Sequence, residues 1–258
     1  MAELIALRTS WLLWCGVLGL GSGVLAAPVT VLVEAYPPFV VERDSTPSGP
    51  YVEAFLRLAT EQGVKAQVIT LPIRRAVTMA VKSTDYCVLA LNFDPGIVNA
   101  LTFLGRIAPM EIWVYSRPGL AGEINRLSDL KNFRVGSIDI AEIRQLLESE
   151  GILYEALQIS SRGLPMLMAR RFDVLISDIG PALTTGKTKF AIERHFMVTQ
   201  VGRWLACHPN TDPATLTALR QVARDGLFAE STQDVWAKYG LDEYYQRVRA
   251  DGAANAKP

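Results

Sequence analysis

The sequence predicts an α/β protein made of two successive series of strands and helices. Short apolar runs alternate with amphipathic segments, as strands and helices do in a parallel or mixed sheet. One series begins at Val29, and a second begins near Glu111. The 258 residues are half hydrophobic, which suits one large domain or two of about 100 residues each.

The first series is predicted from apolar periodicity. The run 29–34 is apolar almost throughout, as in a strand covered on both faces. From Val52 onward, apolar residues recur at i, i+3, i+4 and i+7, which predicts a helix over 50–63 with Pro50 near its start. The segments 66–71, 73–83 and 87–92 are predicted as strand, helix and strand.

The second series has the same alternation. Strands are predicted over 111–119, 134–138 and 173–178, a short helix and turn over 124–133, and helices over 139–151 and 163–172. A strand over 203–210 and helices over 212–228 and 231–241 follow. The polar, alanine-rich tail after Tyr245 is expected to fray.

The N-terminal segment predicts export through a cleaved signal peptide over 1–26. Arg8 precedes the apolar run 11–20, and small residues allow cleavage after Ala26. The run is shorter than the ~20 residues of a membrane span, and Trp14 before Cys15 disfavours a lipid anchor. The 26 basic and 26 acidic residues cancel, so bulk charge gives no support for nucleic-acid binding.

The cysteines indicate a possible disulfide. Loss of Cys15 with the signal would leave Cys87 and Cys207, an even pair in an oxidising compartment. Two free buried cysteines are the alternative. Their spacing, and that of His195 and His208, matches no metal motif, so neither a metal nor another cofactor is expected.

An ordered set of segments carries a resemblance to a known family. These are VLVEAYPPF, GPYVEAF, RLSDLKNFRVGS, ISDIG and LRQVARDGLFAESTQDVWAKYGL. Over 29–241, nearly the whole mature chain, the sequence resembles the periplasmic solute-binding proteins of family 3, which include the amino-acid receptors of ABC importers. No single motif is specific, and the order of the set carries the resemblance.

The resemblance implies a type II periplasmic binding protein fold, in which a ligand lies between two α/β lobes joined by two crossing strands. Lobe 1 would comprise 27–108 and 201–258, and lobe 2 would comprise 109–200. The hinges would lie near Pro109 and Gln200. The strand over 203–210 would then run antiparallel beside that over 87–92 and bring the two cysteines within bridging reach.

Ligands of open α/β sheets lie at the carboxyl ends of the strands, which directs attention to four groups of residues. In the first, Glu34, Tyr36 and Phe39 flank two prolines, and an aromatic wall for the ligand is expected there. The alternative places Phe39 in the core and Tyr36 on the surface.

The second group is LPIRRAV, which resembles the PWxRA pattern of a branch of the family with Ile73 in place of the tryptophan. Arg75 would offer a fixed cation to a carboxylate or another oxyanion. A solvated helix-face arginine is the alternative, and Arg74 is expected on the surface.

The third group follows the strand over 87–92. Related sequences have a segment like ARTPERE here, whose second arginine pairs with the ligand's α-carboxylate, but this chain has Asp94 at the threonine position and Ile97 at the arginine position. A cationic, amide or neutral polar ligand is therefore favoured over ordinary α-amino acids, with Asn92 and Asp94 as polar contacts and Phe93 as a stacking face. The alternative is that FDPG is only a turn.

The fourth group lies in the second series. Ser137 and Asp139 precede a predicted helix, where they would either cap it or help to bind a ligand. Asp178 follows an apolar strand, and the resemblance gives the matching acid the role of holding the ligand's ammonium group. Asp178 and Asp94 would then form a pair suited to an amine.

The predicted function is therefore that of a periplasmic solute-binding protein, expected to be a monomer, that delivers a small polar ligand to the permease of an ABC-type importer. Two other functions remain open. One is an enzyme on the same fold, such as a dehydratase, with Glu34 or Asp178 as general base. The other is a sensory component that binds without transport and contacts a sensor protein.

Overall fold

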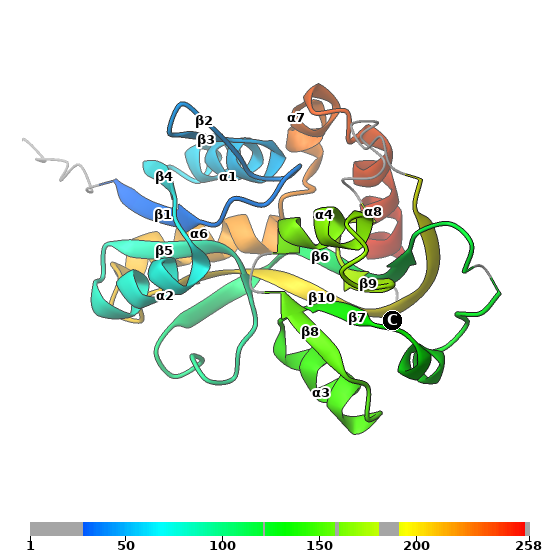
Figure 1. Ribbon diagram of the computed structural model, residues 1–258. Coiled ribbons are helices and arrows are strands. Elements are labelled where there is room, and N and C mark those ends of the chain that lie inside the picture. The colour runs from blue at the N-terminus through cyan, green and yellow to red at the C-terminus, as the bar shows by residue number, and fades with distance from the viewer. Residues whose placement is uncertain (1–27, 121, 158–159, 181–190, 256–258) are drawn as a thin grey trace, which may run out of the picture.

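The computed structural model describes residues 28–120, 122–157, 160–180 and 191–255 (Figure 1). The predicted signal peptide, including its Cys15, lies outside the described residues. The ten described strands are β1 (Val29–Val33), β2 (Val41–Arg43), β3 (Thr46–Ser48), β4 (Ala66–Thr70), β5 (Tyr86–Asn92), β6 (Thr102–Ser116), β7 (Val135–Ile138), β8 (Tyr154–Leu157), β9 (Val174–Ser177) and β10 (Glu193–Cys207). The described α-helices are α1 (Pro50–Glu61), α2 (Ile73–Lys82), α3 (Ala141–Ser149), α4 (Gly163–Met168), α6 (Pro213–Asp225), α7 (Gln233–Lys238) and α8 (Asp242–Asn255).

One mixed sheet runs through the molecule in the order β4-β1-β5-β10-β6-β9-β7-β8. The strands β1, β4 and β5 are parallel to one another, as are β7, β8 and β9. The two long strands β6 and β10 pair antiparallel and connect these two sets, with Pro109 opposite Gly202 and Glu111 opposite Gln200. Figure 1 shows α1, α2 and α6 beside β1, β4 and β5, and α3 beside β8.

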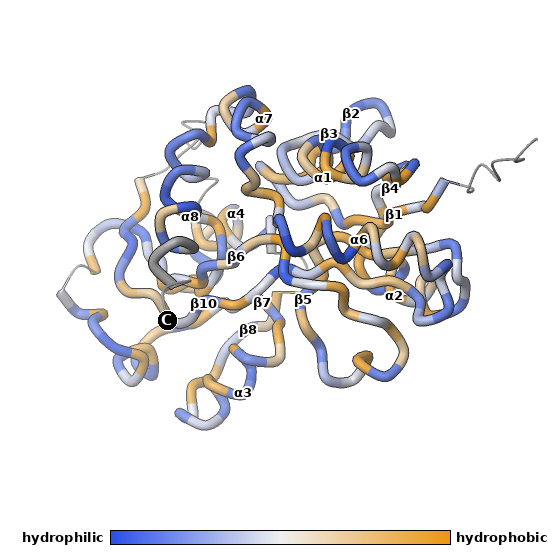
Figure 2. Tube along the Cα trace, turned by 180° about the vertical axis from the view of Figure 1, so that it is seen from behind, coloured by the Kyte–Doolittle hydropathy of each residue, from blue (hydrophilic) through white to orange (hydrophobic). Residues whose placement is uncertain are grey.

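The buried residues form separate cores in the two halves. One core contains Phe55, Leu205 and Trp236, and another contains Ile112 and Ile143. Figure 2 shows hydrophobic stretches along the strands and hydrophilic segments on the outer turns of the helices. Along β6, Ala108 belongs to the first core and Met110 to the second, so the packing changes over at Pro109.

The predicted elements with one buried face are confirmed. Helix α1 buries Val52, Phe55 and Ala59, and α3 buries Ile143 and Leu147. The crossing strands begin earlier than predicted, at Thr102 and Glu193. Because their faces pack against different partners along their length, neither strand keeps a single hydrophobic period. The hairpin of β2 and β3 and the edge strand β8 were not predicted. Each of these three strands has at most four residues.

The prediction that the tail frays after Tyr245 is wrong, because α8 continues to Asn255. Tyr244 and Tyr245 are buried at its start and pack against Trp236 and Phe228. These aromatic contacts anchor the first turn, from which the polar remainder propagates as helix. No described helix has both the length and the apolar character needed to cross a membrane.

The predicted disulfide is confirmed. Cys87 and Cys207 lie opposite each other in the antiparallel pair of β5 and β10 and are bonded. Their Cα atoms are 4.0 Å apart, and the bond links positions separated by 120 residues. Both side chains are fully buried in the first core.

One surface ion pair predicts a pH dependence of stability. The Arg134 guanidinium donates two hydrogen bonds to Asp173, of 3.0 and 2.8 Å, and lowers the pKa of this carboxyl to about 2. An unfolded aspartate has a pKa near ~3.9, so the stabilisation is complete above about pH 4 and is lost as the pH falls toward about 2. Solvent screening of the exposed Arg134 keeps this stabilisation small. Acid unfolding of Asp173→Asn should lack this contribution, and a pH profile identical to that of the original protein would contradict the assignment.

Candidate functional site

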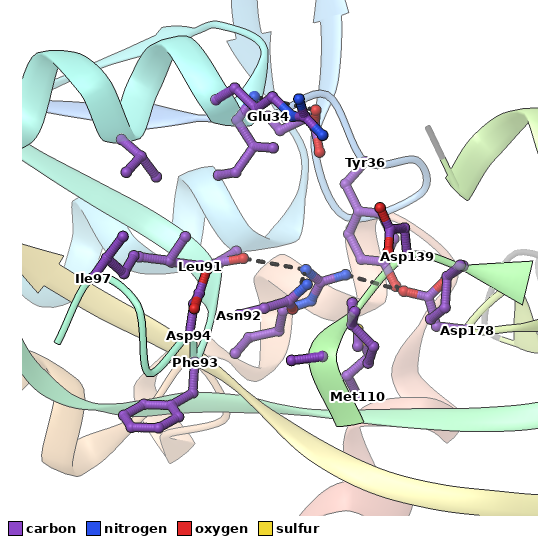
Figure 3. Close-up of a pocket in the computed structure, with 18 of the residues that line it drawn as sticks. Glu34, Tyr36, Leu91, Asn92, Phe93, Asp94, Ile97, Met110, Asp139 and Asp178 are labelled. Atoms are coloured by element: carbon purple, nitrogen blue, oxygen red, sulfur yellow. Dashed lines mark hydrogen bonds and ion pairs between the residues drawn. The ribbon is translucent and has the colours of Figure 1, made fainter. Parts of the chain in front are cut away.

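A cavity of about 520 Å³ opens where the strands of both halves end. Its walls include the ends of β1 and β5, one side of α2, the β7–α3 turn and the residue after β9. Figure 3 shows Tyr36 and Asp178 on one side of this cavity and Leu91, Asp94 and Ile97 on the other. The volume falls within the ~300–1,000 Å³ range of small-molecule sites.

A buried arginine from β10 organises the floor of the cavity. Arg203 donates to Asn92 Oδ1 at 2.8 Å, to the Ala90 carbonyl at 3.3 Å and to Asp178 Oδ2 at 3.0 Å. Only 12% of the Arg203 side chain and 3% of the Asp178 side chain are exposed. The guanidinium carbon lies 4.5 Å from the centroid of the Tyr36 ring, a distance at which the ring stabilises a cation. Figure 3 shows two of these interactions as dashed lines.

Tyr36 completes this network. Its hydroxyl donates to Asp178 Oδ2 at 2.5 Å, across a sequence separation of 142 residues. Burial, together with the nearby Asp178 carboxylate, raises the pKa of Tyr36 well above its usual value, so the hydroxyl remains a neutral donor. Burial opposes the charge of Arg203, but Tyr36 and Asp178 more than offset this and raise the pKa of the guanidinium.

Seven of the ten residues predicted for the site line the cavity. They are Glu34, Tyr36, Asn92, Phe93, Asp94, Asp139 and Asp178. The structure therefore brings together residues of both series at the strand ends where ligands were expected.

Three predicted residues do not line the cavity. Phe39 is 2% exposed and stacks on Tyr51 in the core, with ring centroids 4.6 Å apart, as the alternative interpretation expected. Ser137 is fully buried and its hydroxyl donates to the Ile138 carbonyl, because β7 points this side chain into the protein. The third is Arg75, on the exposed surface of α2.

The orientation of α2 explains why Arg75 does not line the cavity. The residues Ile73, Arg74, Val77 and Thr78 line the cavity, whereas Ala76 and Ala80 are buried against the sheet. Arg75 lies on neither of these faces. The role of Arg75 as a cation in the cleft is therefore wrong, and its alternative as a solvated helix-face arginine holds; Arg74 is exposed, as expected, but also lines the cavity.

The structure places an arginine in the cavity that the sequence analysis did not single out. Ile97, at the position where the resemblance implies the arginine, packs against an apolar cluster, and Arg203 supplies a guanidinium from the crossing strand instead. The sequence analysis missed Arg203 because it sought site residues in the loops that follow strands, whereas Arg203 lies within β10. The available signal was a charged residue at the start of the apolar run WLAC.

The other carboxylates of the cavity also have partners. Asp139 accepts from Arg144 at 2.6 and 3.2 Å. Asp94 Oδ1 accepts from the Gly96 amide at 2.8 Å, which fixes the FDPG turn, and Glu34 accepts from the Ile73 amide at 3.2 Å. Among the described residues, no cluster of three or more His, Cys, Asp or Glu side chains suits a metal ion.

The Phe93 ring has aromatic neighbours of its own. Its centroid lies 5.1 Å from that of Phe103 and 6.0 Å from that of Trp204, and in Figure 3 the ring points away from Asp178. Phe93 therefore lines the cavity at its edge.

Solved structures with this fold are similar across nearly their whole length. The putative binding component of an ABC transporter from Wolinella succinogenes, complexed with lysine, has a TM-score of 0.71 and 14% identity, covering 86% of this chain and 100% of its own. An ancestral arginine-binding protein bound to arginine has a TM-score of 0.68 and 14% identity, covering 82% and 97%. An ancestral amino-acid-binding protein, a precursor of cyclohexadienyl dehydratase, has a TM-score of 0.66 and 15% identity, covering 82% and 95%.

No protein-family model matches the sequence, and no curated protein matches it. The structural matches, together with the mixed sheet and its two crossing strands, confirm the fold that the resemblance implied. The chain has the two-lobe α/β fold of type II periplasmic binding proteins.

Proposed function

We propose that this chain is a periplasmic solute-binding protein that captures a small polar ligand, amino-acid-like, an amine or an amide, and presents it to the permease of an ABC-type importer. The observation that carries the proposal is the cavity lined by both halves of the molecule, with polar groups converging on its floor. Of the similar structures, one is an ancestral arginine-binding protein bound to arginine, and another is the putative binding component of an ABC transporter complexed with lysine. In this proposal the chain is exported by its signal peptide and works as a monomer.

Ligand capture would proceed by closure of two lobes. Lobe 1 would comprise 27–108 and 201–258, and lobe 2 would comprise 109–200, with hinges near Pro109 and Gln200. The change of core between Ala108 and Met110 supports this boundary. A ligand that contacts both lobes favours the closed form, whereas one that contacts a single lobe does not.

Binding fits the cavity better than catalysis does. Asp139 and Asp178 are each held by an arginine, an arrangement that orients the carboxylate and engages one of its two oxygens in an ion pair. The precursor of a dehydratase among the similar structures is itself an amino-acid-binding protein. A sensory role for the same binding event differs only in the partner, a sensor protein in place of a permease.

A thermal-shift screen of small solutes tests this proposal. Glycine, glutamate and aspartate should raise the melting temperature little. Arg203 and Arg144, which line the cavity, are already paired with Asp178 and Asp139, and Ile97 replaces the expected arginine. Amines, amides or other polar solutes should raise it more. Tight binding of acidic amino acids would contradict the predicted ligand preference, and the absence of any response to a mixture of polar metabolites would contradict the function itself.

A further inference from the structure

A hydrogen bond between two protein side chains joins the two proposed lobes across the cavity. The Tyr36 hydroxyl donates to Asp178 Oδ2 at 2.5 Å. Tyr36 follows β1, in lobe 1, and Asp178 follows β9, in lobe 2. Because the proposed hinges near Pro109 and Gln200 separate these two residues along the chain, the bond requires that the two lobe surfaces meet.

Each partner is held within its own lobe. The Tyr36 ring stacks on Phe39, with ring centroids 5.3 Å apart, and packs against the first core. Asp178 directly follows Ser177, which pairs with Trp113 on the lobe 2 part of β6. Tyr36 and Asp178 therefore move with their lobes, and a hinge rotation that separated the lobes would break the bond between them.

A second contact ends on the same carboxylate oxygen. Arg203, which belongs to the returning segment of lobe 1, donates to Asp178 Oδ2 at 3.0 Å. Its guanidinium is held to lobe 1 by further hydrogen bonds to Asn92 Oδ1 and to the Ala90 carbonyl, both on β5. One oxygen of lobe 2 thus receives two donors of lobe 1.

Resting on the proposed closure of two lobes, we propose that Tyr36 and Asp178 form a latch, a protein contact that favours the closed cleft. With its hydroxyl held by Asp178 and its ring centroid 4.5 Å from the guanidinium carbon of Arg203, Tyr36 serves closure as well as lining the cavity. A ligand that contacts both lobes shifts the same equilibrium further.

The latch is weak enough to be reversible. Opening of the cleft would bring water to the Tyr36 hydroxyl and to Asp178, and water replaces most of the lost hydrogen bond. The bond is then worth about tenfold in the ratio of closed to open molecules. The latch therefore shifts this ratio without completing closure, and ligand contacts supply the remainder.

Distances between the lobes of the ligand-free mature chain test the inference. Spin labels would be attached through an unnatural amino acid at Asn99, in the loop after β5, and at Gln145, on α3. Both side chains are exposed, and both segments contribute residues to the cavity wall. In Figure 1 the loop and the helix both project from the lower side of the molecule. Pulsed electron paramagnetic resonance gives the populations of short and long distances.

Tyr36→Phe removes the hydroxyl and keeps the ring that packs on Phe39. The ratio of closed to open molecules should fall about tenfold without any ligand, the effect of one hydrogen bond. An unchanged distance distribution would overturn the inference, because a tyrosine that only contacts the ligand has no effect on the ligand-free protein.

Tyr245→Phe is the matched control. The Tyr245 hydroxyl donates to the Ala229 carbonyl at 3.0 Å, and both residues belong to lobe 1. This variant loses a tyrosine hydrogen bond that does not join the lobes, so its distance distribution should equal that of the original protein. A shift as large as that of Tyr36→Phe would indicate a general effect of lost stability and would overturn the inference.

The measurement separates the latch from the proposed function. Unchanged distances in Tyr36→Phe, together with a solute that stabilises the protein in the thermal-shift screen, would overturn the latch and retain the solute-binding function. A shift in Tyr36→Phe, with no stabilising solute in the screen, would support the latch and contradict the function.

Discussion

Replacing Asp178 by asparagine should lower the free energy of unfolding by about 3–5 kcal/mol. The substitution leaves the Arg203 guanidinium buried with no compensating charge, and it weakens the contact that Tyr36 makes across the two halves. Because 3% and 12% of the two side chains are exposed, solvent cannot replace the lost partner. Urea unfolding of the ligand-free protein measures the effect.

Two further variants make this result specific. Asp178→Leu combined with Arg203→Met removes both charges and should recover much of the loss, because an apolar pair can replace a buried ion pair. Glu155→Gln removes one partner of the exposed pair between Glu155 and Arg171 and should cost at most about 1 kcal/mol. If Asp178→Asn weakened only ligand affinity and left stability unchanged, Asp178 would serve the ligand's ammonium group instead, as the resemblance implied.

Removing the disulfide should have an effect of similar size. Cys87→Ala combined with Cys207→Ala should lower the free energy of unfolding by about 2–5 kcal/mol, because the bond restricts an unfolded chain over a separation of 120 residues. Denaturant unfolding of the mature chain, with and without dithiothreitol, measures this loss.

The reductant itself provides the control. Dithiothreitol should destabilise the original protein and leave the double variant unchanged. Titration of two free thiols in the native mature protein would show that the bond does not form, and equal unfolding curves with and without reductant would show that it does not stabilise the fold.

Local periodicity predicted most of the fold. Helices such as α1 and α3 bury one face, and their apolar spacing follows directly from that. The crossing strands β6 and β10 do not show a regular apolar spacing of this kind. Along β6, buried and partly buried residues follow no constant alternation, because the strand passes from one core to the other and pairs with β9 along only part of its length.

The site was predictable where a loop determines its position. Asn92 ends β5 and Asp178 directly follows β9, so the topology alone brings them to the same edge of the sheet. The prediction that Arg75 faces the cleft was wrong. Which side of α2 faces the cavity depends on how the helix packs on the sheet, and the pattern IRRAV does not determine this. Arg203 belongs to a strand interior, and its direction depends on the irregular register of β10.

The most direct test of the account is small-angle X-ray scattering of the mature chain with and without a saturating solute from the thermal-shift screen. A ligand that contacts both sides of the cavity should reduce the radius of gyration as the two lobes close around it. A bound solute that leaves the scattering curve unchanged would contradict capture by closure of the cleft.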